Sequence, residues 1–80
     1  MNDRIDAGPA PPGARPAKLV LIEQSGTKRE IPQPSTDKGM AEAQQVIHRD
    51  GSHLREVKVV TMNRAVARWK AGELGWQRVA

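Results

Sequence analysis

The first segment patterned like a folded element is the apolar run 19–22, "LVLI", which has polar residues at both ends. A short continuous apolar run is typical of a buried strand, which we predict over 17–24. The glycine in "SGT" (25–27) predicts a turn, and "KREI" (28–31) returns as a second strand. Two prolines directly after it end that strand, and its charges suit the edge of a sheet. We therefore expect a hairpin over 19–31.

The segment 35–51, "STDKGMAEAQQVIHRDG", has the spacing of an amphipathic helix. At about 100° per residue, one side of this helix is apolar and the opposite side is polar. The apolar side consists of Met40, Ala43, Val46 and Ile47. Ser35, Thr36 or Asp37 can cap its first turn, and Gly51 is expected to close its end in a left-handed conformation.

The last third of the chain changes pattern twice. "HLREVKVVTM" (53–62) alternates and predicts a strand with one buried face. In "RAVARWKAG" (64–72) the apolar residues recur at helical spacing, with Asn63 as a cap and Gly72 as a stop, so a second helix is predicted. "ELGWQRVA" (73–80) predicts a turn at Gly75 and a terminal strand, with Trp76 and Arg78 on one of its faces.

The predicted element order is strand, strand, helix, strand, helix, strand. This order favours an α+β fold in which two short helices cover one face of an antiparallel or mixed sheet of three to four strands. The expected core is Leu19, Leu21, Ile22, Ile31, Met40, Ile47, Leu54, Val57, Val59, Val66, Trp69 and Val79. Residues 1–16 are rich in proline and glycine and are expected to be a disordered tail before a single domain over 17–80.

Composition narrows the possible functions. With 80 residues and no cysteine, the chain has room for one domain and holds no disulfide or thiolate metal site. His48, Asp50 and His53 are the one cluster able to do acid–base or metal chemistry, but they span a helix end and a turn, where such residues collect. We predict no enzymatic activity, metal or cofactor. No segment resembles a membrane span or a secretory signal, so we expect a cytoplasmic monomer without membrane contact.

Charge is distributed unevenly along the chain. Residues 1–53 carry seven basic and seven acidic side chains, whereas residues 54–80 carry six basic and two acidic ones. The candidate basic surface comprises Arg55, Lys58, Arg64, Arg68 and Lys70. This asymmetry indicates an acidic or polyanionic partner. Arg64 and Arg68, four residues apart on the expected second helix, are the main candidates for partner contact on this surface. Trp76 and Arg78 are a further candidate contact.

The tail offers a second candidate contact. Arg4 and Ile5 lie between Asp3 and Asp6, ahead of the proline-rich stretch "AGPAPPGARPAK" (7–18). Proline and glycine keep such a stretch extended and soluble, so it can act as a spacer. An apolar residue among charges beyond a spacer is typical of a binding arm that orders on contact. An inert chain end is the alternative.

The tail, the compact mixed fold and a composition rich in Arg, Ala and Gly without Phe or Tyr resemble the small phage-encoded transcription regulators that bind bacterial RNA polymerase, of the Xanthomonas phage type. The resemblance implies host RNA polymerase as the partner, with displacement of the initiation factor and antitermination. It assigns no role to any single residue.

The leading hypothesis is a non-enzymatic regulator that binds a large bacterial protein machine, with RNA polymerase as the suspected partner. Weakly sequence-specific nucleic-acid binding through the basic last third is an alternative. A structural or assembly protein of a phage is another.

Overall fold

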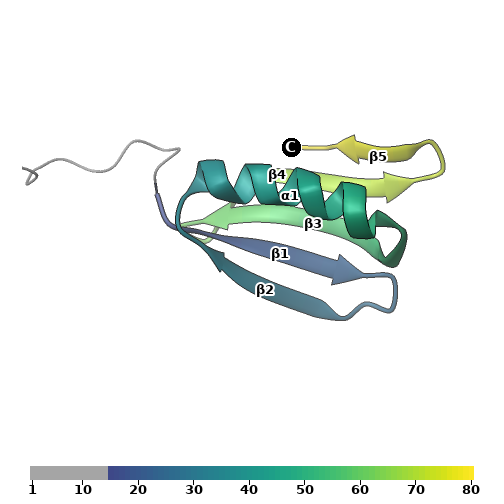
Figure 1. Cartoon of the computed structure of the whole chain (residues 1–80), viewed down its shortest axis with the longest axis horizontal. Helices are drawn as coiled ribbons and strands as arrows, with labels where there is room; N and C mark the ends of the chain where they lie inside the picture. Colours follow the sequence, from purple (N-terminus) through teal and green to yellow (C-terminus); the bar gives the residue numbers. More distant parts are fainter. Residues whose placement is uncertain (1–14) are drawn as a thin grey trace, which may run out of the picture.

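Five antiparallel strands form one sheet in the order β2-β1-β3-β4-β5, with one α-helix on one of its faces (Figure 1). This is a computed structural model, and it describes residues 15–80. The elements are β1 (Ala17–Glu23), β2 (Lys28–Gln33), α1 (Thr36–Asp50), the 3-10 helix η2 (Gly51–His53), β3 (Leu54–Thr61), β4 (Arg64–Gly72) and β5 (Gly75–Arg78). Most of the expected disordered tail, residues 1–14, lies outside the described residues.

The core lies between α1 and the face of the sheet that α1 covers. Alternate residues of the three central strands point toward the helix and are buried. The buried side chains of this cluster are Ala17, Leu19, Leu21, Ala43, Val46, Leu54, Val57, Val59, Ala67 and Trp69. Helix α1 contacts mainly β3 and β1. The strands β2 and β5 form the two margins of the sheet.

Helix α1 begins as the sequence predicts, because the Ser35 side chain accepts a hydrogen bond from the Lys38 backbone N–H at 3.1 Å. Gly39 is buried and lets the helix approach β3 closely, since a Cβ built there would lie 3.1 Å from Cγ1 of Val59. The expected left-handed helix end is wrong. Gly51 has φ −59°, and the chain continues into η2.

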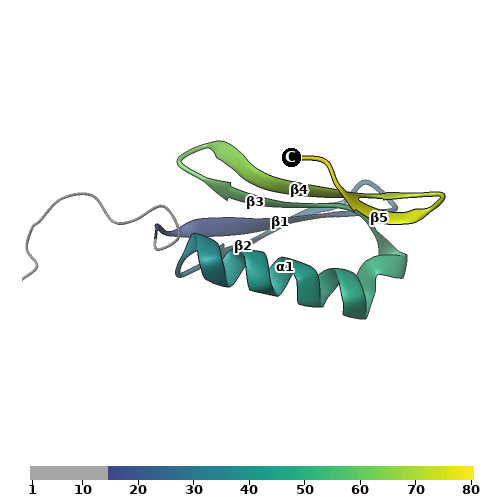
Figure 2. The ribbon, with the colours of Figure 1, turned by 90° about the horizontal axis from the view of Figure 1, so that it is seen from above.

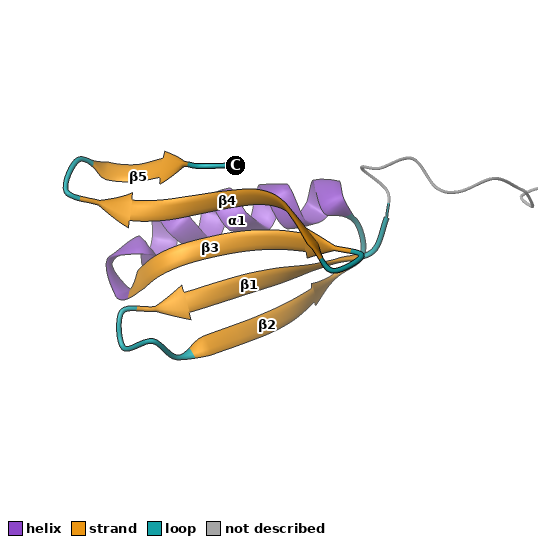
Figure 3. Ribbon diagram, turned by 180° about the vertical axis from the view of Figure 1, so that it is seen from behind, coloured by secondary structure: helices purple, strands orange, loops and turns teal. Residues whose placement is uncertain are grey.

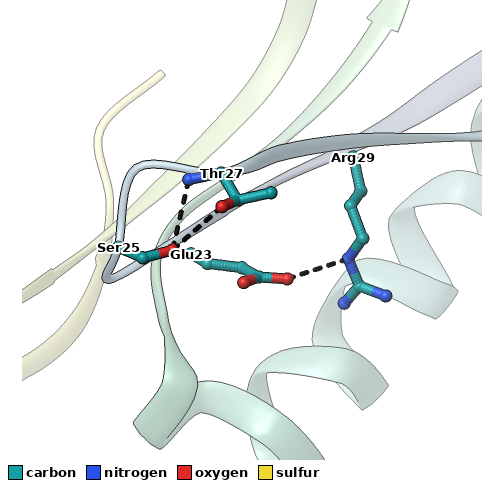
Figure 4. Close-up of polar contacts among 4 residues, drawn as sticks. All are labelled: Glu23, Ser25, Thr27 and Arg29. Atoms are coloured by element: carbon teal, nitrogen blue, oxygen red, sulfur yellow. Dashed lines mark hydrogen bonds and ion pairs between the residues drawn. The ribbon is translucent and has the colours of Figure 1, made fainter.

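The hairpin expected over 19–31 is confirmed as β1 and β2. Gly26 has φ +96° and closes a tight turn in which the Gly26 N–H donates to the Glu23 carbonyl. Polar side chains also join its two ends (Figure 4). The Ser25 and Thr27 hydroxyls lie 3.0 Å apart, and Arg29 Nε lies 3.2 Å from a Glu23 carboxylate oxygen.

The second predicted helix is wrong: residues 64–72 form the strand β4 (Figure 3). Asn63 does not cap a helix; it shares a two-residue hairpin turn with Met62, and both residues have positive φ, 63° and 51°. Two positive φ values define the type I′ turn that joins antiparallel strands. β4 covers the edge that β3 would otherwise expose, and β5 then pairs with β4. Over residues 15–80 the fold therefore has five strands and one α-helix, not three to four strands and two such helices.

The predicted core changes accordingly. Val66 has no partner in the register between β3 and β4, which shifts at this point, and its side chain is exposed. Ile31 and Val79, at the margins of the sheet, are also exposed, whereas Ile22, Met40 and Ile47 are partly buried. The predicted core omitted three alanines and two valines that are buried: Ala17, Val20, Ala43, Val46 and Ala67.

Candidate functional site

The face of the sheet opposite α1 is uncovered by any other element of residues 15–80 (Figure 2). Strand alternation directs Lys18, Val20 and Ile22 of β1 toward this face. Their register partners on the neighbouring strands share it. We call this surface the open face; its charged residues are Lys18, Lys28, Glu30, Glu56, Lys58, Arg68 and Lys70.

An open groove of about 510 Å³ lies on the part of the open face where the β3–β4 hairpin turns. We call it the lysine groove, because three lysines from three adjacent strands line it. Its lining consists of Pro16, Ala17, Lys18, Val20, Lys28, Glu30, Lys58, Val60, Thr61, Met62, Asn63 and Ala65. Lysines surround an apolar floor, so the groove can receive carboxylates and an apolar group together.

Val20 is the centre of that apolar floor. Its side chain is 4% exposed, yet it does not belong to the core beneath α1. On the open face it is flanked by Glu30 and Lys58, its register partners. Long lysine side chains cover apolar surface with their methylene stems while their ammonium groups stay in water. Lys58, the neighbour of Val20 on β3, is placed to shield it in this way.

The charges around the groove are only loosely paired. Lys18 and Lys28 lie 3.5 and 3.6 Å from the two carboxylate oxygens of Glu30, and all three side chains are about half exposed. Exposed pairs of this kind contribute little to stability. Lys58 makes no ion pair within 4 Å among residues 15–80. A second carboxylate can thus bind here without first breaking a strong contact.

The hairpin end of the groove is held by the start of the described chain. The Thr61 hydroxyl donates a hydrogen bond to the Pro16 carbonyl at 2.8 Å, and Arg15 Nη1 lies 3.3 Å from Met62 Sδ. The Thr36 hydroxyl in turn lies 3.3 Å from the Arg15 carbonyl. These contacts tie residues 15 and 16 to the β3–β4 hairpin and fix one wall of the groove.

Beyond the groove, the open face carries further charged side chains on β3 and β4. Arg68 Nε donates to a Glu56 carboxylate oxygen at 3.1 Å, and Glu56 is the more buried partner. Lys70 is the register partner of Glu56 on β4. The open face in total holds five basic side chains against two acidic ones, which makes it a positively charged surface.

The predicted basic surface is only partly assembled. Lys58, Arg68 and Lys70 share the open face, but Arg55 lies at a register shift in β3 and Arg64 lies at the hairpin end of β4. Lys18 and Lys28 were missed, because the neutral charge balance of residues 1–53 and the continuous apolar run after Lys18 did not indicate a basic surface there.

The other predicted contact residues lie elsewhere. Trp76 and Arg78 belong to the face that α1 covers: Trp76 packs against the core, and the Arg78 guanidinium lies 5.6 Å from the centroid of the Trp69 ring. Arg4 and Ile5 lie outside the described residues. Both tryptophans are thus on the far side of the sheet from the lysine groove.

The cluster around His48 does not have the arrangement of a metal site. His48 and His53 are exposed at the end of α1, and the Asp50 carboxylate accepts a hydrogen bond from Arg49 Nε at 3.0 Å. Over residues 15–80, no three His, Cys, Asp or Glu side chains are grouped as metal ligands. No helix in the described part of the chain is long and apolar enough to cross a membrane.

Comparison with known proteins gives no family for this chain. No family model matches it, and neither curated proteins nor solved structures yielded a significant match.

Proposed function

We propose that this chain is a non-enzymatic binding protein that regulates a larger bacterial protein machine by docking an acidic segment of it on the open face. The observation that carries the proposal is the sheet face left uncovered opposite α1, with its lysine groove. Bacterial RNA polymerase is the partner to test first, and its support is the resemblance in size and composition described above.

The surface favours a protein partner because its charges and its apolar atoms are interleaved. Val20 and Val60 lie beside Lys58 and Lys18 in the cross-strand register. A protein segment can match both kinds of group, with carboxylates for the lysines and an aliphatic side chain for the valines. Charge complementarity then accelerates encounter and fixes register, while the apolar contact contributes affinity.

Nucleic acid fits the same surface less well, although its net positive charge favours a polyanion. Glu30 and Glu56 lie among the basic side chains of the open face, where they would repel phosphates. Sheets that bind single strands stack bases on aromatic side chains. The open face has none, since Trp69 and Trp76 lie on the helix side and the chain has no Phe or Tyr.

The test measures binding of the fluorescently labelled full chain to purified bacterial RNA polymerase, as core enzyme and with its initiation factor. Three proteins are compared: wild type, Lys58→Glu on the open face, and Lys38→Glu on the exposed side of α1 as a control with the same charge change. We expect wild type and Lys38→Glu to bind alike and Lys58→Glu to bind at least about tenfold more weakly, since reversing a charge in a complementary interface costs several kcal/mol.

Two results would overturn the proposal in different ways. Absence of binding to either form of the enzyme removes RNA polymerase as the partner, and equal binding of both charge variants removes the open face as the surface. Binding to naked duplex DNA tighter than the nonspecific range of roughly 10⁻⁴ to 10⁻⁶ M, falling steeply with salt, would establish nucleic-acid binding instead.

A further inference from the structure

We propose that the lysine groove recognises one apolar side chain flanked by acidic residues in an extended segment of the partner, and that Met62 is the residue that determines this specificity. The inference rests on the proposed function and deepens it, because it names the chemistry that the groove selects. Four features carry it: the backbone of Met62, the exposure of its side chain, its place in the groove and the lysines beside it.

The backbone of Met62 is strained. Its φ is +51°, in the left-handed region, and it is followed by Asn63 at φ +63°. A type I′ turn requires both values and favours Asn and Gly, whose backbones adopt them readily. Asn63 meets that preference and Met62 does not. A residue held in a costly backbone conformation is compatible with selection for something that its side chain does.

Packing of the Met62 side chain in the core does not offset the cost of this backbone conformation. The side chain is 71% exposed, and it is not part of the buried cluster beneath α1. It lines the groove instead, together with Val60 and Ala65 from the two strands that the turn joins. Its thioether contacts Arg15, so the side chain is also held in place at the hairpin end of the groove.

The groove therefore has an apolar end at the hairpin in addition to the Val20 floor between its lysines. Met62, Val60 and Ala65 form an apolar end at the hairpin, whereas Lys18, Lys28 and Lys58 extend from it across three strands. Methionine is flexible and polarisable and adapts to side chains of different shape. An extended segment advances about 3.3 Å per residue, so acidic residues next to the apolar one reach the lysines. The expected ligand is an aliphatic residue with acidic neighbours.

The test uses two blocked pentapeptides in an NMR titration of the full chain. One has two glutamates, a leucine and two glutamates, and the other has serine in place of the leucine. Wild type should bind the leucine peptide about tenfold more tightly, the size expected for burying part of one leucine side chain. Signals of Val60, Met62 and Ala65 should shift only with the leucine peptide.

Two variants separate recognition from a merely structural role. Met62→Asn should remove the discrimination between the peptides while raising the melting temperature, because Asn relieves the strained backbone. Lys58→Glu should weaken both peptides together. A structural residue would not combine greater stability with lost discrimination.

Equal binding of the two peptides to wild type, or unchanged discrimination in Met62→Asn, would overturn the role given to Met62 and leave docking on the open face standing. Failure of both peptides to shift the groove signals would overturn the proposed ligand chemistry. The polymerase measurement with Lys58→Glu then decides the proposed function separately.

Discussion

Gly51 lies against the indole nitrogen of Trp76: a Cβ built on Gly51 would be 2.8 Å from Nε1 of that ring. Gly51 follows the last residue of α1, and Trp76 lies on β5 at the margin of the sheet. Their contact joins the end of the helix to the terminal strand, which α1 otherwise leaves largely uncovered. The glycine is needed for its small size here, since its φ of −59° is open to any residue.

Gly51→Ala should therefore destabilise the protein by about 1–3 kcal/mol, the cost of forcing an extra methyl group into a packed contact. Trp76 must move outward, so its fluorescence should shift to the red in a Trp69→Phe background. Urea denaturation gives the free energy of unfolding. If Gly51→Ala is neutral or stabilising, the helix end and Trp76 are not in this contact.

A double-mutant cycle isolates the pair. Trp76→Leu removes the ring that meets the new methyl group, so Gly51→Ala should cost clearly less in that background than in the wild type. Equal costs in the two backgrounds would mean that the glycine matters for another reason.

Trp69→Ala should cost about 3–5 kcal/mol, as expected when a large buried aromatic side chain is removed. Trp69 is 8% exposed in the core of β4, and Arg78 covers its ring. Arg78→Ala is the matched comparison and should cost about 0.5–1 kcal/mol, because it removes a cation–π contact and an exposed hydrogen bond from Arg78 Nε to the Ala80 backbone oxygen at 2.7 Å. Similar costs for the two variants in urea denaturation would contradict this division.

The sequence predicted the first half of the fold well because its signals there are local. The run "LVLI", the glycine of the turn and the Ser35 cap each act within a few residues of themselves. For segment 64–72 the local signals, Asn63 as a cap and Gly72 as a stop, indicated a helix and were misleading. Alanine and arginine favour helices, and its apolar residues fit a helical spacing, but Ala67 and Trp69 also alternate with Arg68 and Lys70. These residues form a strand because they pair with the edge of β3. Local propensity takes no account of this long-range pairing.

The candidate site was predicted in part for the same reason. Lys58, Arg68 and Lys70 were found by counting charge in the last third of the chain. Lys18 and Lys28 come from a segment that is electrically neutral overall, and they reach the groove only because β1 pairs with both β2 and β3. The order of strands in a sheet is a long-range property, so no local pattern could supply it.

Ser35→Ala should destabilise the protein by about 1 kcal/mol, because it removes the side-chain acceptor for the Lys38 N–H at the start of α1. For a domain of this size, that corresponds to a fall in melting temperature of roughly 4–8 °C. Ser52→Ala, at an exposed serine in η2, is the control and should change the free energy of unfolding by no more than about 0.5 kcal/mol. A Ser35→Ala variant that melts with the control would show that another group caps the helix.

Comparing Val59→Ala on β3 with Val66→Ala on β4 tests whether residues 64–72 form a strand or a helix. Val59 is fully buried, so its truncation should cost about 2 kcal/mol from lost transfer energy and the cavity left behind. Val66 is 40% exposed at the register shift in β4, so its truncation should change stability by no more than about 0.5 kcal/mol. In a helix that packed Met62, Val66 and Trp69 on the sheet, both valines would be buried and both truncations costly. Chemical denaturation of the two variants gives the comparison, and a large cost at Val66 would contradict the strand.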